Sequence, residues 1–132
     1  MRFTERELTL ALEGVAKSVL ATQDKDVRKG RRTADDAWSA LTKYQRYQML
    51  AGLGDQLLGV LVALPDVEVA VGTRPTFTEA QIVATVQDAS RDDVRGLKGK
   101  VLLKARVALV QLALSHVPPR ADPDALVVPD HL

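Results

Sequence analysis

The sequence predicts an all-α protein, a single compact bundle of four to five helices over residues 1–117. Two observations support this fold class. Phe-Thr-Glu occurs twice, each time directly before an apolar run with helical spacing. The two most apolar stretches, residues 49–64 and 101–117, are interrupted by polar side chains and are shorter than a bilayer span requires. We therefore interpret both stretches as buried helices.

The composition is typical of one globular domain: 132 residues, 46% hydrophobic and 27% charged. A net charge of +1 creates no strong field toward nucleic acid or an acidic membrane. The absence of cysteine excludes disulfides and thiolate chemistry and fits a reducing compartment. We expect a cytoplasmic protein with no membrane partner.

The first Phe-Thr-Glu predicts a helix from Glu5 to about Thr22. The Thr4 hydroxyl can accept from the Glu7 backbone, and the Glu7 side chain can reach back to the backbone of Thr4. Phe3 precedes this capping box, in the position of a hydrophobic staple. Apolar side chains at helical spacing then form one face of this helix. The charged stretch 23–32 that follows predicts a loop.

The second Phe-Thr-Glu predicts a helix from Glu79 to about Ser90. Thr78 and Gln81 repeat the capping box, and Phe77 repeats the staple position. Few other residues match between the two copies. We therefore interpret the repeat as two independent helix starts, rather than as an internal duplication.

Residues 33–64 predict a long helical segment that begins after Thr33 and stops at Pro65. This length favours a break, either near Thr42 or at Gly52 and Gly54. Glycine inside a helix costs about 1 kcal/mol relative to alanine. Gly52, Gly54 and Gly59 therefore indicate a bend or the close approach of a neighbouring helix.

The remaining segments predict one more helix and two extended regions. Alternating valines give a short extended segment near 67–71, which we interpret as a linker or as a ribbon partner of residues 125–128. A helix over about 97–117 is apolar nearly all round and should be central. Residues 118–132 form an extended tail rich in proline and aspartate.

Catalytic and metal-binding patterns are weak. The stretch GLGDQLLG at 52–59 lacks the third glycine and the preceding strand of a dinucleotide loop. Ser115 and His116 are neighbours on a helix, so their side chains point apart. The only other histidine is His131, and no spacing gathers three metal ligands. We expect no enzyme activity, no cofactor and no metal.

Two basic clusters are candidates for nucleic-acid contact through phosphate groups. The first lies around a glycine in the charged loop and the second on the last helix. Their members are Arg28, Lys29, Arg31, Arg32, Lys100 and Lys104. This function requires both clusters to lie on one surface.

Trp38, Leu41 and Tyr44 form a stripe at helical spacing, which is more typical of a core face than of a contact surface. If they are exposed, Trp38, Tyr44 and Tyr47 are candidates for contact with a protein partner. Our leading prediction is a small non-enzymatic interaction or scaffold domain that self-associates as a homodimer or binds a protein partner. The alternative is a nucleic-acid-binding accessory protein that uses residues 28–32. A third hypothesis, an apolar ligand held between the two core helices, requires an enclosed cavity.

Overall fold

The computed structural model describes residues 1–89 and 96–121, and these residues form helices and connecting loops without any strand. The predicted all-α fold is therefore confirmed. The described ranges contain six helices, one of which is a single turn. Their bounds are α1 Glu5–Gln23, α2 Lys25–Arg28, α3 Ala34–Ala40, α4 Lys43–Ala63, α5 Glu79–Ala89 and α6 Gly96–Ser115.

Threonine side chains begin four of these helices. The Thr4 hydroxyl accepts from the Glu7 backbone N–H at 3.1 Å, and the Glu7 carboxylate accepts from the Thr4 N–H at 2.8 Å. Thr78 and Gln81 make the same reciprocal pair at 3.1 and 2.8 Å. Both predicted capping boxes are confirmed. Equivalent boxes start α3 at Thr33 with Asp36, and α4 at Thr42 with Gln45.

The predicted break in the segment 33–64 falls at Leu41, whose backbone is extended between α3 and α4. Thr42 then caps α4, so the first of the two predicted break points is the observed one. The helix continues without interruption past Gly52 and Gly54 to Ala63.

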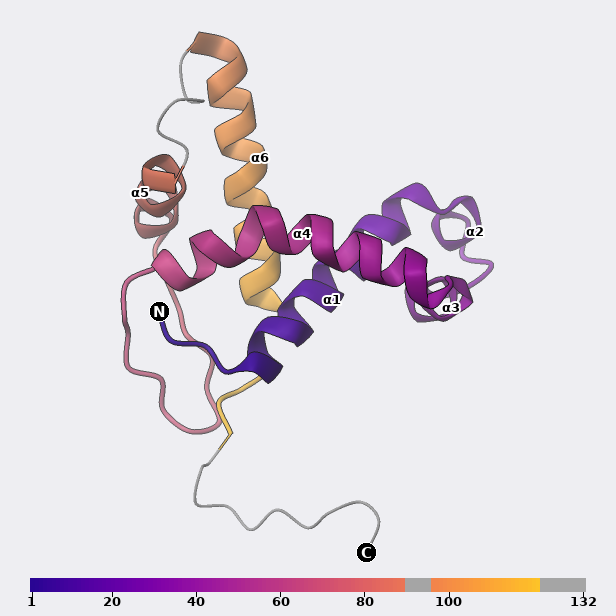
Figure 1. Cartoon of the computed structure of the whole chain (residues 1–132), viewed down its shortest axis with the longest axis horizontal. Coiled ribbons are helices and arrows are strands. Elements are labelled where there is room, and N and C mark those ends of the chain that lie inside the picture. Colours follow the sequence, from indigo (N-terminus) through magenta and orange to yellow (C-terminus); the bar gives the residue numbers. More distant parts are fainter. Residues whose placement is uncertain (90–95, 122–132) are drawn as a thin grey trace, which may run out of the picture.

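The helices pack around α1, which contacts α2, α3, α4 and α6. In Figure 1, α4 crosses in front of α6, while α2 and α3 lie at one end of the molecule and α5 at the other. α5 packs on α6 and α4. The largest fully buried side chains come from α1, α4, α5, α6 and the residues that follow α4 and α6: Val15, Leu57, Leu61, Leu64, Val86, Val110 and Val117.

The link between α4 and α5 is a loop, and the extended segment predicted near 67–71 makes no strand. Val67 and Val69 instead pack against the core. Arg120 pairs with this loop: its N–H donates to the Thr73 carbonyl at 2.7 Å, and its carbonyl accepts from the Gly72 N–H at 2.9 Å. The Arg120 side chain donates to the buried Glu7 carboxylate at 3.0 Å and so ties this loop to the start of α1.

The end of α4 is held by Met1. The Met1 ammonium donates to the carbonyl of Val62 at 2.9 Å and to that of Leu64. These carbonyls have no partner within the helix, and a positive group stabilises the negative end of the helix dipole. The chain start thus supplies the charge that is absent from the last turn of α4, which has no basic side chain.

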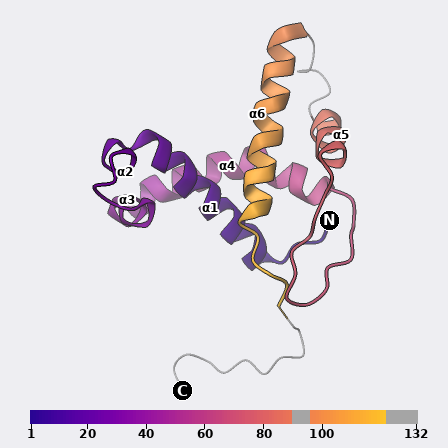
Figure 2. The same cartoon turned by 180° about the vertical axis from the view of Figure 1, so that it is seen from behind.

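The last helix differs from the sequence prediction, because only part of α6 is central. Val107, Val110 and Ala113 in its C-terminal half are buried, whereas Leu97 and Val101 near its start are exposed. Figures 1 and 2 both show the N-terminal half extending beyond α1 and α4. The apolar side chains of α6 therefore belong to two parts of the helix, a buried C-terminal half and an exposed N-terminal half.

Several sequence interpretations fall on residues 90–95 and 122–132, which lie outside the described ranges. They concern the helix end predicted near Ser90, the strand-like run 125–128, His131 and most of the tail 118–132.

Candidate functional site

Tyrosine and aliphatic side chains form an exposed row on α4. Tyr44 and Tyr47 are each 68% exposed, and Val62 is 54% exposed. The opposite face of the helix is buried in the core. We call the exposed row the α4 stripe; its apolar and aromatic members are Tyr44, Tyr47, Ala51, Leu58 and Val62, and the exposed Asp55 lies among them.

The sequence positions the α4 stripe through the cap at Thr42. Because the chain breaks at Leu41, α4 starts a new helix whose rotation is set by its buried face. That face comprises Gly54, Leu57, Val60 and Leu61. Tyr44 and Tyr47 then fall on the solvent side.

Trp38 does not belong to this exposed row. It lies on α3 and is buried. The helical spacing of Trp38, Leu41 and Tyr44 predicts one stripe, but the break at Leu41 divides it. Of the three aromatic candidates, the structure leaves Tyr44 and Tyr47 accessible.

Two glycines lie on the outer side of α4. A Cβ added at Gly52 or Gly59 would meet no atom within 4 Å. The close helix approach that these glycines predict is therefore not made by any described residue of this chain. At Gly52 and Gly59 the outer side of α4 therefore presents bare backbone, and no described residue of the protomer covers it.

The basic loop after α2 is partly paired with acidic side chains. Arg31 lies 3.8 Å from Asp26, and Arg32 forms a hydrogen-bonded ion pair with Asp24. The Arg32 guanidinium holds the pKa of Asp24 below its ordinary value. Asp24 also caps α2, accepting from two backbone N–H groups. Two of the four loop cations therefore contact acidic side chains of the same segment.

The two basic clusters are not brought together. Arg28 and Lys29 are exposed at the end of α2, while Lys100 and Lys104 are exposed on the N-terminal half of α6. Both views place these elements at separate ends of the molecule (Figures 1 and 2). The two clusters are therefore not neighbours in the fold.

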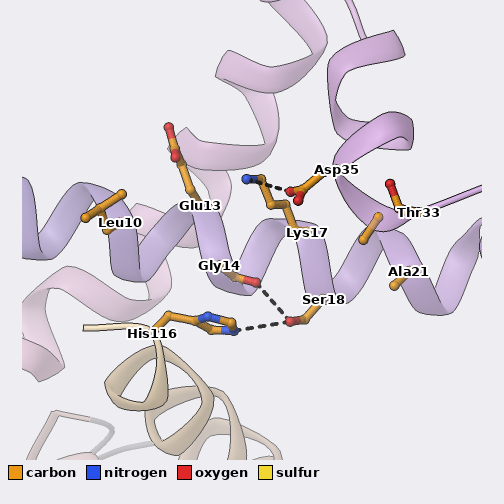
Figure 3. A pocket seen from close by; sticks show the side chains of 10 residues that line it. Leu10, Glu13, Gly14, Lys17, Ser18, Ala21, Thr33, Asp35 and His116 are labelled. Carbon is orange, nitrogen blue, oxygen red and sulfur yellow. Dashed lines mark hydrogen bonds and ion pairs between the residues drawn. The ribbon is translucent and has the colours of Figure 1, made fainter. Parts of the chain in front are cut away.

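A pocket of about 520 Å³ lies between α1, the start of α3 and His116 (Figure 3). The imidazole ring of His116 lies directly on Gly14: a Cβ built there would be 2.1 Å from the His116 Cγ atom. His116 Nε2 is 3.4 Å from the Ser18 hydroxyl oxygen. Lys17 and Asp35 form an ion pair of 2.9 Å beside it.

The Ser18–His116 pair does not have the arrangement of an activated nucleophile. The Ser18 hydroxyl donates to the Gly14 carbonyl at 2.9 Å, so its proton is directed away from the imidazole. Asp35, a carboxylate of the pocket, is engaged by Lys17. We interpret the contact as packing of the residue after α6 onto α1.

Sequence reasoning missed this contact because Ser18 and His116 are 98 positions apart. Gly14 was the available signal, since glycine in the middle of an otherwise apolar and charged helix is costly unless something requires it.

A second pocket, of about 470 Å³, lies between the end of α4 and α5. Its lining includes Gln81, Thr85 and Asp88. Neither of the two pockets lies between α4 and α6, where the ligand hypothesis places its ligand.

Within residues 1–89 and 96–121, no group of three His, Cys, Asp or Glu side chains is placed to hold a metal ion. In the same part of the chain, none of the helices has the length and apolar character needed to cross a membrane. Comparison with protein-family models, curated protein sequences and solved structures finds no match to this chain.

Proposed function

We propose that this chain is a small, non-enzymatic interaction domain that self-associates through the α4 stripe. The observation that supports this function is the exposure of Tyr44 and Tyr47, each at 68%, on the same helix face as Val62. Aromatic side chains are enriched at the centres of protein interfaces, where they supply large contact area at low entropic cost. The partner that we propose for this face is a second copy of the chain.

The spacing of the stripe favours a helix as its partner. Tyr44, Ala51 and Leu58 follow one another at intervals of seven. A seven-residue repeat keeps one row of side chains facing a second helix along the length of a supercoiled pair. The open glycines Gly52 and Gly59 beside this row permit close approach of the second backbone.

The sizes of the side chains favour an antiparallel, two-fold arrangement. The bulky tyrosines lie near the start of α4, and the slimmer Val62 lies near its end. Antiparallel pairing about the level of Leu53 places Tyr44 opposite the partner's Val62 and Tyr47 beside the partner's Leu58. A two-fold interface brings the same patch of both copies together. The contact between the tyrosine end of one α4 and the Val62 end of the other is therefore made twice.

The nucleic-acid alternative receives less support. Its six cations lie in two separated clusters, and two of them, Arg31 and Arg32, contact acidic side chains. A phosphate backbone is bound by several cations along one continuous surface. The cytoplasm remains our proposed compartment, because a chain without cysteine gains nothing from an oxidising one.

Self-association is tested by the solution mass of the protein across a range of concentrations. We expect a mass that rises from one protomer to two. Val62→Glu should keep the protein monomeric, because it adds a second carboxylate to a face that already carries Asp55. Val71→Glu is the matched control: Val71 is 56% exposed, against 54% for Val62, but lies outside α4.

The outcomes separate the possibilities. A single-protomer mass at every concentration would contradict self-association. An equal loss of the dimer in Val62→Glu and Val71→Glu would place the interface elsewhere. Salt-sensitive binding of a mixed DNA and RNA pool, lost on replacing Arg28 and Lys29 with alanine, would move the nucleic-acid function to first place.

A further inference from the structure

The N-terminal half of α6 is a second exposed apolar surface, separate from the α4 stripe. Leu97 is 80% exposed and Val101 63%. In Figure 1, α4 lies in front of α6, and in Figure 2, from behind, α6 lies in front. The N-terminal half of α6 extends past α4, so this surface lies on a different element from the α4 stripe. We call residues 96–108 of α6 the α6 tip.

Positive charge surrounds the exposed apolar side chains of the α6 tip. Lys98, Lys100 and Lys104 are all exposed, and the sequence from 96 to 115 contains no aspartate or glutamate. The tip is therefore basic, although the whole chain has a net charge of only +1.

The spacing orders these residues along one helix face. Leu97, Val101, Lys104 and Ala108 follow one another at intervals of four, three and four, which is the spacing of neighbours on a helix surface. Lys100 and Lys98 flank this row on its two sides. Lys104 is the one charged member of this otherwise apolar row, and Ala105 leaves room beside it.

We propose that the α6 tip docks an acidic amphipathic helix of a partner protein. Leucine-type side chains of the partner would pack on Leu97 and Val101, and its carboxylates would pair with the lysines on both sides. Helices recognise such surfaces through side chains at intervals of three and four, and opposite charges fix their register. This inference does not depend on pairing through α4, because the two surfaces lie on different helices.

The same features disfavour the two other anionic partners. A lipid surface would bury the middle of the apolar row, where Lys104 stands in line with Leu97 and Val101. Charged side chains that bind at a bilayer interface instead lie at the borders of the apolar face. A phosphate backbone would pair with the lysines but leave Leu97 and Val101 unused.

The test uses the full chain and a fluorescent helical peptide with leucines on one face and glutamates on both sides of it. A second peptide with glutamine in place of glutamate controls for charge. We expect the acidic peptide to bind more tightly, with affinity falling as salt is added. The triple variant Lys98→Glu, Lys100→Glu, Lys104→Glu should weaken binding at least about tenfold.

A second variant tests the apolar contact. Leu97→Gln with Val101→Gln keeps the charge of the tip and should also weaken peptide binding, by about tenfold. The matched control is Lys25→Glu, Arg28→Glu, Lys29→Glu, which makes the same charge change on the exposed surface of α2. It should leave peptide affinity nearly unchanged, and circular dichroism should show the native helix content in all variants.

Three results would overturn the proposal. One is failure of the acidic peptide to bind the folded protein. Another is equal weakening by the α2 control, which would make the attraction a general charge effect. The third is tighter binding, dependent on the α6 lysines, to vesicles of phosphatidylserine and phosphatidylcholine or to single-stranded oligonucleotides, which would assign the surface to lipid or nucleic acid.

Discussion

At the residue scale, the contact between Gly14 and His116 shows how one side chain fixes the packing of two helices. The imidazole lies where a Cβ on residue 14 would have to be, with His116 Cγ at 2.1 Å and Cβ at 2.5 Å from that position. A glycine in the middle of α1 loses helix propensity but allows the residue after α6 to approach the α1 backbone.

Gly14→Ala is therefore expected to destabilise the protein, by about 1–2 kcal/mol, because overpacking outweighs the gain in helix propensity. Chemical denaturation measures this change. In a His116→Gly background the same substitution should become neutral or stabilising, since the obstructing atoms are gone. An equal loss of stability in both backgrounds would show that the ring is not the cause.

The pair formed by Asp24 and Arg32 predicts a pH effect at the same scale. The hydrogen-bonded Arg32 lowers the pKa of Asp24 below its ordinary value of 3.8. A carboxyl whose folded pKa is depressed stabilises the fold above its unfolded pKa, and this contribution disappears as the pH falls through the folded pKa. The α2 segment should therefore lose order only under strongly acidic conditions.

Arg32→Ala should raise the pKa of Asp24 toward 3.8. An NMR titration of the Asp24 carboxyl carbon measures it directly. Lys29→Ala is the control, because Lys29 is an exposed cation of the same loop. An Asp24 titration curve that Arg32→Ala leaves unmoved would contradict the assigned cause.

At the element scale, helix starts could be predicted from the sequence and helix rotation could not. The boxes at Thr4 and Thr78 depend on neighbours three residues away, so the local sequence defines them. The box at Thr42 has the same pattern with Gln45, but the apolar period running through it left Gly52 and Gly54 as a second possible position for the break. The burial of Trp38 depends on that break, which explains why spacing alone grouped Trp38 with Tyr44.

The glycines of α4 give a prediction that contrasts with Gly14. Because a Cβ at Gly52 or Gly59 meets nothing within 4 Å, alanine at either position should stabilise the protomer, by up to about 1 kcal/mol each. Denaturation at concentrations below dimer formation measures the protomer alone. A loss of stability there would show that the outer side of α4 is covered within one protomer.

At the scale of the whole molecule, the fold class followed from the periodic pattern, but the arrangement of surfaces did not. Sequence periodicity assigned α6 to the centre because it has no polar face, yet its N-terminal half extends past the helices that would cover it. The long-range contacts of Arg120 with Glu7 and with the loop at 72–73 were likewise beyond local patterns. Such contacts depend on topology, which spacing does not encode.

The protein is a helical domain with two exposed surfaces on different helices: a largely apolar stripe on α4 and a basic, apolar tip on α6. The first is assigned to a second copy of the chain and the second to an acidic helix. We infer pairing through α4 because exposed tyrosines and open glycines share this helix.

Cysteine cross-linking tests that claim most directly, since the chain has no cysteine of its own. Antiparallel pairing predicts that a mixture of Tyr44→Cys and Val62→Cys proteins forms a disulfide-linked dimer of the two different chains under mild oxidation. Val71→Cys, equally exposed and outside α4, should cross-link poorly with either. Efficient cross-linking of Val71→Cys, or no cross-link between positions 44 and 62, would contradict the account.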